Sequence, residues 1–421
     1  MYKKQVLKNG LTILRVPIKG AKSVLVDIFV KVGSRHENQK INGVSHFLEH
    51  LFYKGSKKYP TAAKLSHALD AIGAEYNANT GKEHTQFYIK AAKKHLPFIF
   101  EVLTDMLQNP VFAPEEIERE KGVIIEEINM YEDTPMRHVE DVLEEIMWPA
   151  HPLGRNIAGT KEVVKTITRQ KILDYVRTFY QPQNLILAVA GAYRETLLDK
   201  LIAQSWAGQP SKKIPGWQKV KEIQTKPVLK IEPKKTEQYH LAMGFRSYHH
   251  NHPDYIPQIV LAAILGGGMS SRLFHEIRER QGWAYYVKAT PANYQDTGLF
   301  AVQAGVRRDA LPQVVQTVIR ELIKIKTQLV PSAELRKVRE YLKGTLTLSL
   351  EESESRLGWY LEQVAFRKKV LEPEGAFDLI DQVTAGDIRR VARDVFQNRK
   401  LNFAIVGPDK YRTQIRKFLR V

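Results

Sequence analysis

The chain has 421 residues, 43% of them hydrophobic, which is typical of a globular protein with more than one domain, and its formal net charge of +18 would suit a nucleic-acid binder. It contains no cysteine, so disulfides, thiolate zinc clusters, iron–sulfur clusters and a cysteine nucleophile are excluded, and any metal must be bound by His, Asp or Glu. The lysines and arginines are scattered along helical stretches with glutamates between them, which indicates solvated faces rather than a nucleic-acid site.

The amino-terminal residues predict a strand and not a targeting segment. Residues 1–16 mix lysines with alternating apolar residues around an Asn9-Gly10 turn, a pattern that lacks the apolar run of a signal peptide. No window of the sequence has the unbroken apolar length that is needed to cross a bilayer. We therefore expect a cytoplasmic protein without a membrane partner.

Strand-like runs open each half of the sequence, and pairs of long helices follow them. In the clearest predicted helices, a proline or a capping residue comes just before apolar residues that recur with the spacing of a helix. The predicted strands include residues 23–32 and 239–245, and the predicted helices include residues 96–107 and 114–131. Strands with helices packed against them predict an α+β fold made of sheet-and-helix sandwiches.

The sequence contains an internal duplication. Residues 168–191 combine an amphipathic helix, a short turn and an apolar strand that ends in glycine, and residues 384–407 repeat the same apolar positions at a constant offset. Two further pairs occur in the same order, Gly73–Tyr76 with Gly282–Tyr285 and Leu96-Pro97 with Leu311-Pro312. Three repeated features in one order predict two homologous domains.

A linker separates the two repeats. The segment 207–233 is rich in glycine, proline and lysine and shows little periodicity before Val228, which is typical of an exposed connection between domains. We predict an N-terminal domain at 1–208, a linker at 209–227 and a C-terminal homologous domain at 228–421.

The strongest chemical signal is the segment GVSHFLEHL at residues 43–51. If it is helical, His46, Glu49 and His50 lie at positions i, i+3 and i+4 and project from one face within one turn. Two imidazoles can then share a catalytic zinc, which needs about three protein ligands and one position open to water. Glu49 is placed to accept that water's proton. The order His-x-x-Glu-His is the inverzincin pattern. On these residues alone, a helix face on which the three side chains pair with one another is the alternative.

A third ligand is available on the predicted helix 114–131. Glu120 and Glu127 are seven residues apart and lie on the same side of that helix, whereas Glu126 points elsewhere. One carboxylate can ligate the metal while the other orients a histidine. A solvated acidic helix face is the alternative for these residues.

These motifs resemble those of the pitrilysin or insulinase-like metallopeptidases, with most likeness to the half-length bacterial relatives of mitochondrial processing peptidase. The resemblance rests on HFLEH followed by VIIEE and covers essentially the whole chain. Further matching phrases are Asn77–Thr80 with Glu83 and Thr85, Met130–Pro135, His151–Gly154 and GGGMSSRLF at residues 266–274.

The resemblance implies one zinc per protomer. It assigns His46, His50 and Glu127 as the ligands, Glu49 as the general base and Glu120 as the carboxylate that supports a ligand. These roles come from the family, because the spacing of Glu120 and Glu127 alone leaves open which of them binds the metal.

The resemblance also implies how a substrate is held. The strand with Asn77, Ala78 and Asn79 would pair its edge with an extended peptide. Arg278 and Tyr285 would reach the zinc site from the partner half of a clamshell, hold the substrate carbonyl and stabilise the oxyanion. Tyr286 is the alternative for the tyrosine. From the residues alone, the strand end and the Arg/Tyr pair are ordinary structural features.

We therefore expect a zinc-dependent endopeptidase that hydrolyses peptides or unfolded polypeptide segments in a chamber. Because full-length family members join four similar domains and this chain has two, it would form half of a clamshell, and a homodimer would complete the chamber. One alternative is a catalytically idle or partner subunit of a processing-peptidase-like complex, although such subunits usually lose part of the zinc motif. Another is a nucleic-acid-binding module, which would need a basic stripe with interleaved aromatics that the sequence lacks.

Two other motifs are weaker. The glycines at 266–268 are not followed by Gly-Lys-Ser/Thr and have no Rossmann context, so we expect a tight turn or close packing there and no phosphate site. His249, His250 and His252 precede Pro253 in a loop without helical or hairpin spacing, which makes them poor candidates for metal ligation.

Overall fold

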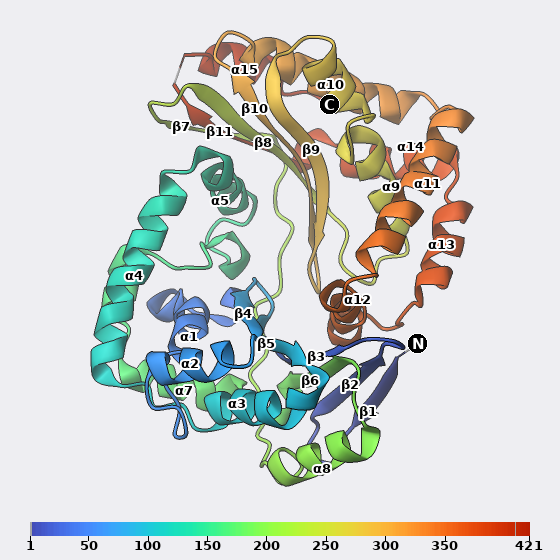
Figure 1. The fold of residues 1–421 in the computed structure, drawn as a ribbon. Coiled ribbons are helices and arrows are strands. Elements are labelled where there is room, and N and C mark those ends of the chain that lie inside the picture. Colours follow the sequence, from blue (N-terminus) through green and yellow to red (C-terminus); the bar gives the residue numbers. More distant parts are fainter. Residues whose placement is uncertain (1, 409) are drawn as a thin grey trace. The chain divides into compact units, whose positions relative to one another are not determined.

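The computed structural model describes residues 2–408 and 410–421, which contain two sheets (Figure 1). The six-stranded sheet has the order β1-β2-β6-β3-β5-β4, and the five-stranded sheet has the order β7-β11-β8-β10-β9. The strands of the first sheet are β1 (Lys3–Val6), β2 (Thr12–Pro17), β3 (Ser23–Val30), β4 (Glu75–Thr80), β5 (Thr85–Ala92) and β6 (Leu185–Gly191). Those of the second are β7 (Val228–Pro233), β8 (Gln238–Ser247), β9 (Ala284–Asn293), β10 (Gly298–Arg307) and β11 (Leu401–Gly407).

The two sheets repeat one topology. The order β2-β6-β3-β5-β4 corresponds strand by strand to β7-β11-β8-β10-β9. In each sheet the first pair of this series is parallel, β2 with β6 and β7 with β11, and the remaining pairs are antiparallel. The duplication predicted from the sequence is confirmed, because the repeated segments 168–191 and 384–407 form equivalent helix–strand units.

Fifteen α-helices surround these sheets in the described residues, and local sequence explains where several of them begin. Thr168 and Thr384 each accept a hydrogen bond from a backbone amide of the first helical turn, and two helices begin with the repeated Leu-Pro pair. The helices are α1 (Val44–Phe52), α2 (Ala62–Asp70), α3 (Leu96–Gln108), α4 (Pro114–Glu132), α5 (Pro135–Met147), α6 (Lys161–Thr166), α7 (Arg169–Phe179), α8 (Glu195–Ser205), α9 (Tyr255–Gly266), α10 (Leu311–Thr327), α11 (Ser332–Ser349), α12 (Ser353–Phe366), α13 (Pro373–Gln382), α14 (Ala385–Val395) and α15 (Arg412–Phe418), and a π-helix, η6, spans Phe274–Glu279.

The chain forms two compact units that are not the two halves of the sequence. The first unit comprises the residues up to Asn129 together with 155–218 and 349–365, and the second comprises 130–154, 219–348 and 366–421. Helix α5 from the first half thus belongs to the second unit, and nearly all of α12 from the second half belongs to the first. The predicted ranges 1–208, 209–227 and 228–421 stay a prediction about the repeats in the sequence.

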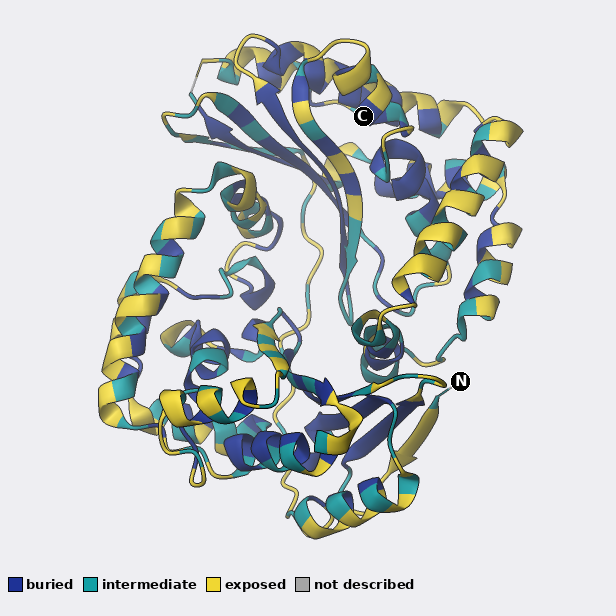
Figure 2. Ribbon diagram, in the orientation of Figure 1, coloured by how far each residue is buried: buried dark blue, intermediate teal, exposed yellow. Residues whose placement is uncertain are grey.

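The core of the first unit lies between one face of its sheet and the helices. Alternate residues of β3, namely Val24, Val26, Ile28 and Val30, join buried residues of α1, α3 and α7 in one cluster, as expected for a strand whose side chains alternate between two faces. In Figure 2 the central strands are dark blue, whereas α4 and α11 are mainly yellow and teal with a few buried positions, as expected for surface helices.

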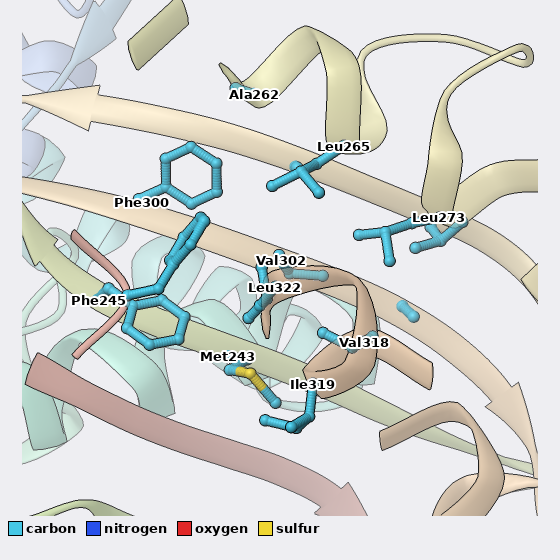
Figure 3. Close-up of a cluster of buried hydrophobic side chains, with 14 of the residues drawn as sticks. Met243, Phe245, Ala262, Leu265, Leu273, Phe300, Val302, Val318, Ile319 and Leu322 are labelled. Carbon is cyan, nitrogen blue, oxygen red and sulfur yellow. The ribbon is translucent and has the colours of Figure 1, made fainter. Parts of the chain in front are cut away.

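The second sheet is covered on both faces. On one face Phe245 and Phe300 pack with residues of α9 and α10, as Figure 3 shows. On the other face Val139, Leu143 and Met147 of α5 pack against strands β8, β10 and β11. Because both faces are covered, β8, β10 and β11 are buried along nearly their whole length. None of the helices in the described residues combines the length and the apolar composition that crossing a bilayer requires.

One buried carboxyl group interrupts the apolar sheet of the first unit. Asp27 on β3 is 1% exposed. Its Oδ2 accepts a hydrogen bond from the Gln86 amide, and its Oδ1 has no partner among the described residues. Burial raises the pKa of Asp27 to about 7, although the hydrogen bond from Gln86 opposes the shift. Since the charged form is disfavoured in this position, deprotonation of Asp27 destabilises the fold.

We predict that Asp27→Asn removes a pH dependence of stability. The pKa of Asp27 is higher in the folded chain than in the unfolded chain, so the contribution of this group to the free energy of unfolding is largest at acidic pH and is lost as the pH rises through about 7. Between about pH 5.5 and about pH 8 the loss from this group is roughly 2 kcal/mol. Denaturant unfolding of both proteins at the two pH values measures it. Equal losses in wild type and variant would show that another group is responsible.

Candidate metal centre

Helix α1 is held in place at its N-terminus by a buried carboxylate. Glu37 accepts hydrogen bonds from the backbone amides of Gly43 and Ser45 at 2.7 and 2.8 Å and from the Asn42 side chain at 2.9 Å. A negative charge at a helix N-terminus is favourable because it compensates the unpaired amides and the helix dipole. Gly43 has a φ of 98°, and a Cβ there would collide with the carbonyl oxygen of Ala158. Only glycine fits this position.

The burial pattern of α1 selects which side chains are accessible. Seven of its nine residues are buried, and only Glu49 and His50 are half-buried. Val44, Phe47 and Leu48 face the core of the first unit. The helical period therefore directs the His-x-x-Glu-His face toward α4 and away from the core.

His46, His50 and Glu127 come together between α1 and α4. One potential ligand atom from each of the three lies within 4.8 Å of the other two. The Nε2 atoms of His46 and His50 are 3.5 and 3.4 Å from the same oxygen, Oε2 of Glu127. The side chains of His46, His50 and Glu127 are 10%, 20% and 20% exposed, so the group is partly accessible. No other such group of His, Asp or Glu occurs in residues 2–408 and 410–421.

These distances fit a zinc ion. Tetrahedral ligands at zinc bond lengths of about 2.0–2.2 Å lie roughly 3.3–3.6 Å from one another, which matches the distances of 3.5 and 3.4 Å from Oε2 of Glu127 to the two imidazole nitrogens. Two imidazole nitrogens and a carboxylate oxygen are also donors that zinc accepts. Three such ligands leave a fourth coordination position for another group.

Glu120 fixes the outer nitrogen of His50. Its Oε2 lies 3.1 Å from Nδ1 of His50. When Nδ1 donates a hydrogen bond to this carboxylate, Nε2 carries the lone pair, and Nε2 is the atom that lies next to Glu127. Burial by itself lowers the pKa of His50, but the contacts with Glu120 and Glu127 outweigh it and raise the pKa to about 9. The site therefore attracts positive charge. Nδ1 of His46, by contrast, has no hydrogen-bond partner among the described residues.

Lys54 belongs to no motif in the sequence, yet it contacts the buried carboxylate of Glu120. Its Nζ is 2.7 Å from Oε1 of Glu120, and Glu120 is only 1% exposed. Burial by itself raises the pKa of Glu120, but the hydrogen bonds from His50 and Lys54 outweigh it and hold the pKa below its usual value. The available signal was the spacing of four residues between His50 and Lys54, although Lys54 lies in the turn after α1.

Glu49 and Glu126 do not belong to the ligand group. Glu49 lies on α1 between the two histidines, half-buried and outside the group of three. Burial raises the pKa of the neighbouring Tyr53, and the charges of Tyr88 and Glu49 add to the shift. Glu126 is exposed and accepts a hydrogen bond from Asn129.

The strand with Asn77, Ala78 and Asn79 lies at the edge of the first sheet. β4 pairs with β5 on one side and ends the strand order. Tyr53, the residue that follows α1, donates a hydrogen bond of 2.8 Å to the carbonyl oxygen of Asn77. The helix with the two histidines is thereby tied to the edge strand. An edge strand can accept a further strand along its free side.

Arg278 and Tyr285 lie on irregular elements of the second unit. Arg278 belongs to the π-helix η6. Tyr285 has no partner in the pairing of β9 with β10, where Ala284 pairs with Val306 and Tyr286 with Gly305. This β-bulge leaves Tyr285 71% exposed, with the Arg278 guanidinium 5.6 Å from its ring centre. π-helices and bulges of this kind are frequent at functional sites.

Tyr286, the alternative tyrosine, is already engaged. Its hydroxyl lies 3.3 Å from Nδ1 of His240, and its ring packs closely on Gly305. The geometry therefore favours Tyr285 as the residue that is free to meet a ligand beside Arg278.

The two weaker motifs have structural roles. Gly266 and Gly267 have no room for a side chain, because a Cβ would collide with Ala289 and Ala263 respectively, so the expected close packing is found. Nδ1 of His249 and Nδ1 of His252 each accept a hydrogen bond from a backbone amide two residues further along the chain.

Comparison with family models matches two regions of the chain. Residues 15–161 match the model described as insulinase, peptidase family M16, and residues 166–342 match the model described as the peptidase M16 inactive domain. The first region contains His46, Glu49, His50 and Glu127, and the second contains Arg278 and Tyr285.

Relatives and solved structures agree with this match. The chain is 34% identical to a Bacillus subtilis protein named "Uncharacterized zinc protease YmxG", over 97% of this chain and 98% of the relative. It is 32% identical to an uncharacterized zinc protease of Streptomyces coelicolor, over 96% and 89%. The fold is similar to that of a protease from Helicobacter pylori, with a TM-score of 0.91 and 23% identity over 97% of this chain and 100% of that one.

Proposed function

The chain belongs to the insulinase family of peptidases, M16, and we propose on this basis that it is a zinc-dependent endopeptidase acting on peptides or unfolded polypeptide segments. The observation that carries the proposal is the convergence of His46, His50 and Glu127 at distances that fit zinc, with Glu49 on the same helix outside that group. Relatives that are at least 30% identical over nearly their full length are named zinc proteases.

Each residue of the proposed site has a defined task. His46, His50 and Glu127 would hold the zinc, which when bound acts as a Lewis acid that lowers the pKa of water and polarises a carbonyl group. Glu49 accepts a proton from the attacking water and delivers it to the departing amine.

The substrate would be held by two further sets of residues. Its backbone would add to the free edge of β4 at Asn77, Ala78 and Asn79, which selects an extended conformation rather than particular side chains. Arg278 and Tyr285 would donate hydrogen bonds to the carbonyl oxygen of the scissile bond as negative charge develops on it.

The alternative is an idle or partner subunit of a processing-peptidase-like complex. Such a subunit requires neither a metal nor a base. This chain has all three candidate ligands together with Glu49, and it positions His50 with a buried carboxylate. The complete set favours catalysis.

We also propose that the working unit is a homodimer. The chain has both the metal motif and the Arg278/Tyr285 pair, on two different compact units. Two identical copies related by a two-fold axis would each complete the other's site and enclose a chamber, so that no second type of subunit is needed.

The first prediction from this proposal concerns the third ligand. Glu127→Gln should lose bound metal and peptidase activity together, because a neutral amide is a poor zinc ligand. Metal analysis of the purified variant measures the loss. The neighbouring change Glu126→Gln, on the exposed side of α4, is the matched control and should retain both. Stoichiometric zinc in Glu127→Gln would show that another residue is the third ligand.

The second prediction concerns the base. Glu49→Gln should retain zinc and the fold but lose hydrolysis by roughly two to four powers of ten, because an amide cannot accept the proton. Measuring both peptide cleavage and bound zinc in the same preparation distinguishes loss of the base from loss of the metal. Near-wild-type turnover by a preparation free of contaminating peptidase would remove Glu49 from the mechanism.

The third prediction concerns the homodimer. A Glu49→Gln protomer and an Arg278→Ala/Tyr285→Phe protomer should each be inactive alone. Mixed under conditions of subunit exchange, they should recover up to about a quarter of the wild-type activity, because each mixed dimer contains one intact site. Cleavage assays before and after exchange measure the recovery. Full activity of a protein that light scattering shows to be monomeric would rule the dimer out.

A further inference from the structure

We propose that Lys54 is a positioning residue of the metal centre, which fixes Glu120 and through it the ring of His50. The inference rests on the proposed function, because it assumes that His46, His50 and Glu127 bind zinc. By this proposal Lys54, which lies outside the His-x-x-Glu-His motif, contributes to the affinity for zinc.

The carboxylate of Glu120 is held by two partners, His50 in the last turn of α1 and Lys54 in the turn that follows the helix. Oε2 is 3.1 Å from Nδ1 of His50, and Oε1 is 2.7 Å from Nζ of Lys54. His50 lies in the last turn of α1, and Lys54 lies two residues beyond the end of the helix. With both oxygens engaged, the carboxylate plane cannot rotate without breaking one contact. The orientation of the His50 ring therefore depends on Lys54.

The backbone around Lys54 is fixed as well. The amide of Lys54 donates to the carbonyl of Leu51 at 3.0 Å, and the carbonyl of Gly55 accepts from the amide of Val111 at 3.1 Å. Val111 lies three residues before the start of α4, the helix with Glu120 and Glu127. These bonds join the segment after α1 to the segment before α4, which restrains the backbone that carries the Lys54 ammonium group.

Burial distinguishes this ion pair from an ordinary surface pair. Glu120 has a side-chain exposure of 1%, so removal of Lys54 would leave a buried carboxylate with His50 as its one remaining partner among these contacts. Lys58 and Glu101 form a pair at the similar distance of 2.9 Å, but their side chains are 54% and 44% exposed. Exposed pairs contribute little, and this one has no contact with a candidate ligand. Lys58 is therefore the matched control.

The test is zinc affinity measured without substrate. Zinc is titrated against a chromophoric chelator in wild type, Lys54→Met, Lys54→Arg and Lys58→Met. Lys54→Met should raise the zinc dissociation constant roughly ten- to one-hundred-fold, the usual effect of losing an outer partner of a metal ligand. Lys54→Arg retains the charge and should stay within about threefold of wild type, as should Lys58→Met. Thermal unfolding of the metal-free proteins checks that each variant is folded.

A double variant isolates the route through Glu120. If Lys54 acts only by holding Glu120, then Lys54→Met has no further effect on zinc affinity in a Glu120→Gln background. Independent, multiplicative effects of the two changes would overturn the proposal, and so would wild-type affinity in Lys54→Met. Because no peptide is used, wild-type protein that binds zinc but cuts no peptide would count against the proposed function alone.

Discussion

The position of helix α1 is the constraint on which the metal centre depends. The helix is only nine residues long, and an isolated helix of that length is unstable in water. Its stability comes from the apolar residues that it buries in the core of the first unit and from Glu37, which occupies the amides at its start. The contact of Glu120 with Lys54 ties its end to α4. The histidines are therefore placed by the core of the unit and not by the motif alone.

Sequence periodicity predicts the features that depend on local geometry. The spacing of His46, Glu49 and His50 defines a common helix face wherever that helix lies. The repeated helix–strand segments predict two similar sheets, because the same local sequence forms the same supersecondary unit. The spacing of Glu120 and Glu127 correctly places both on the side of α4 that faces α1, where one meets His50 and the other meets both histidines.

Features that depend on contacts between distant residues were not predictable. Glu37 and Lys54 are ordinary charged residues in the sequence, and only the fold shows that one holds the start of α1 and the other a buried carboxylate. The apolar period of α5 indicates a buried face but not which sheet covers it. The bulge at Tyr285 is also hidden, because the sequence repeat aligns it with Tyr76, whose ring packs against the core. In the second repeat Tyr285 is left unpaired at the bulge, and its side chain is exposed to solvent.

The exchange of helices between the two repeats affects how the protein is made. The first compact unit contains residues 349–365 from the second half of the sequence, and the second unit contains residues 130–154 from the first half. During synthesis the sheet of the first repeat leaves the ribosome long before α12 exists, and the apolar face of α5 emerges before its own sheet. Neither unit can therefore be completed from one continuous stretch of the growing chain. Apolar surface remains exposed until late in translation. The duplication that produced two similar domains thus yields a chain that must fold largely as a whole, with a period of vulnerability to aggregation that two sequential domains would avoid.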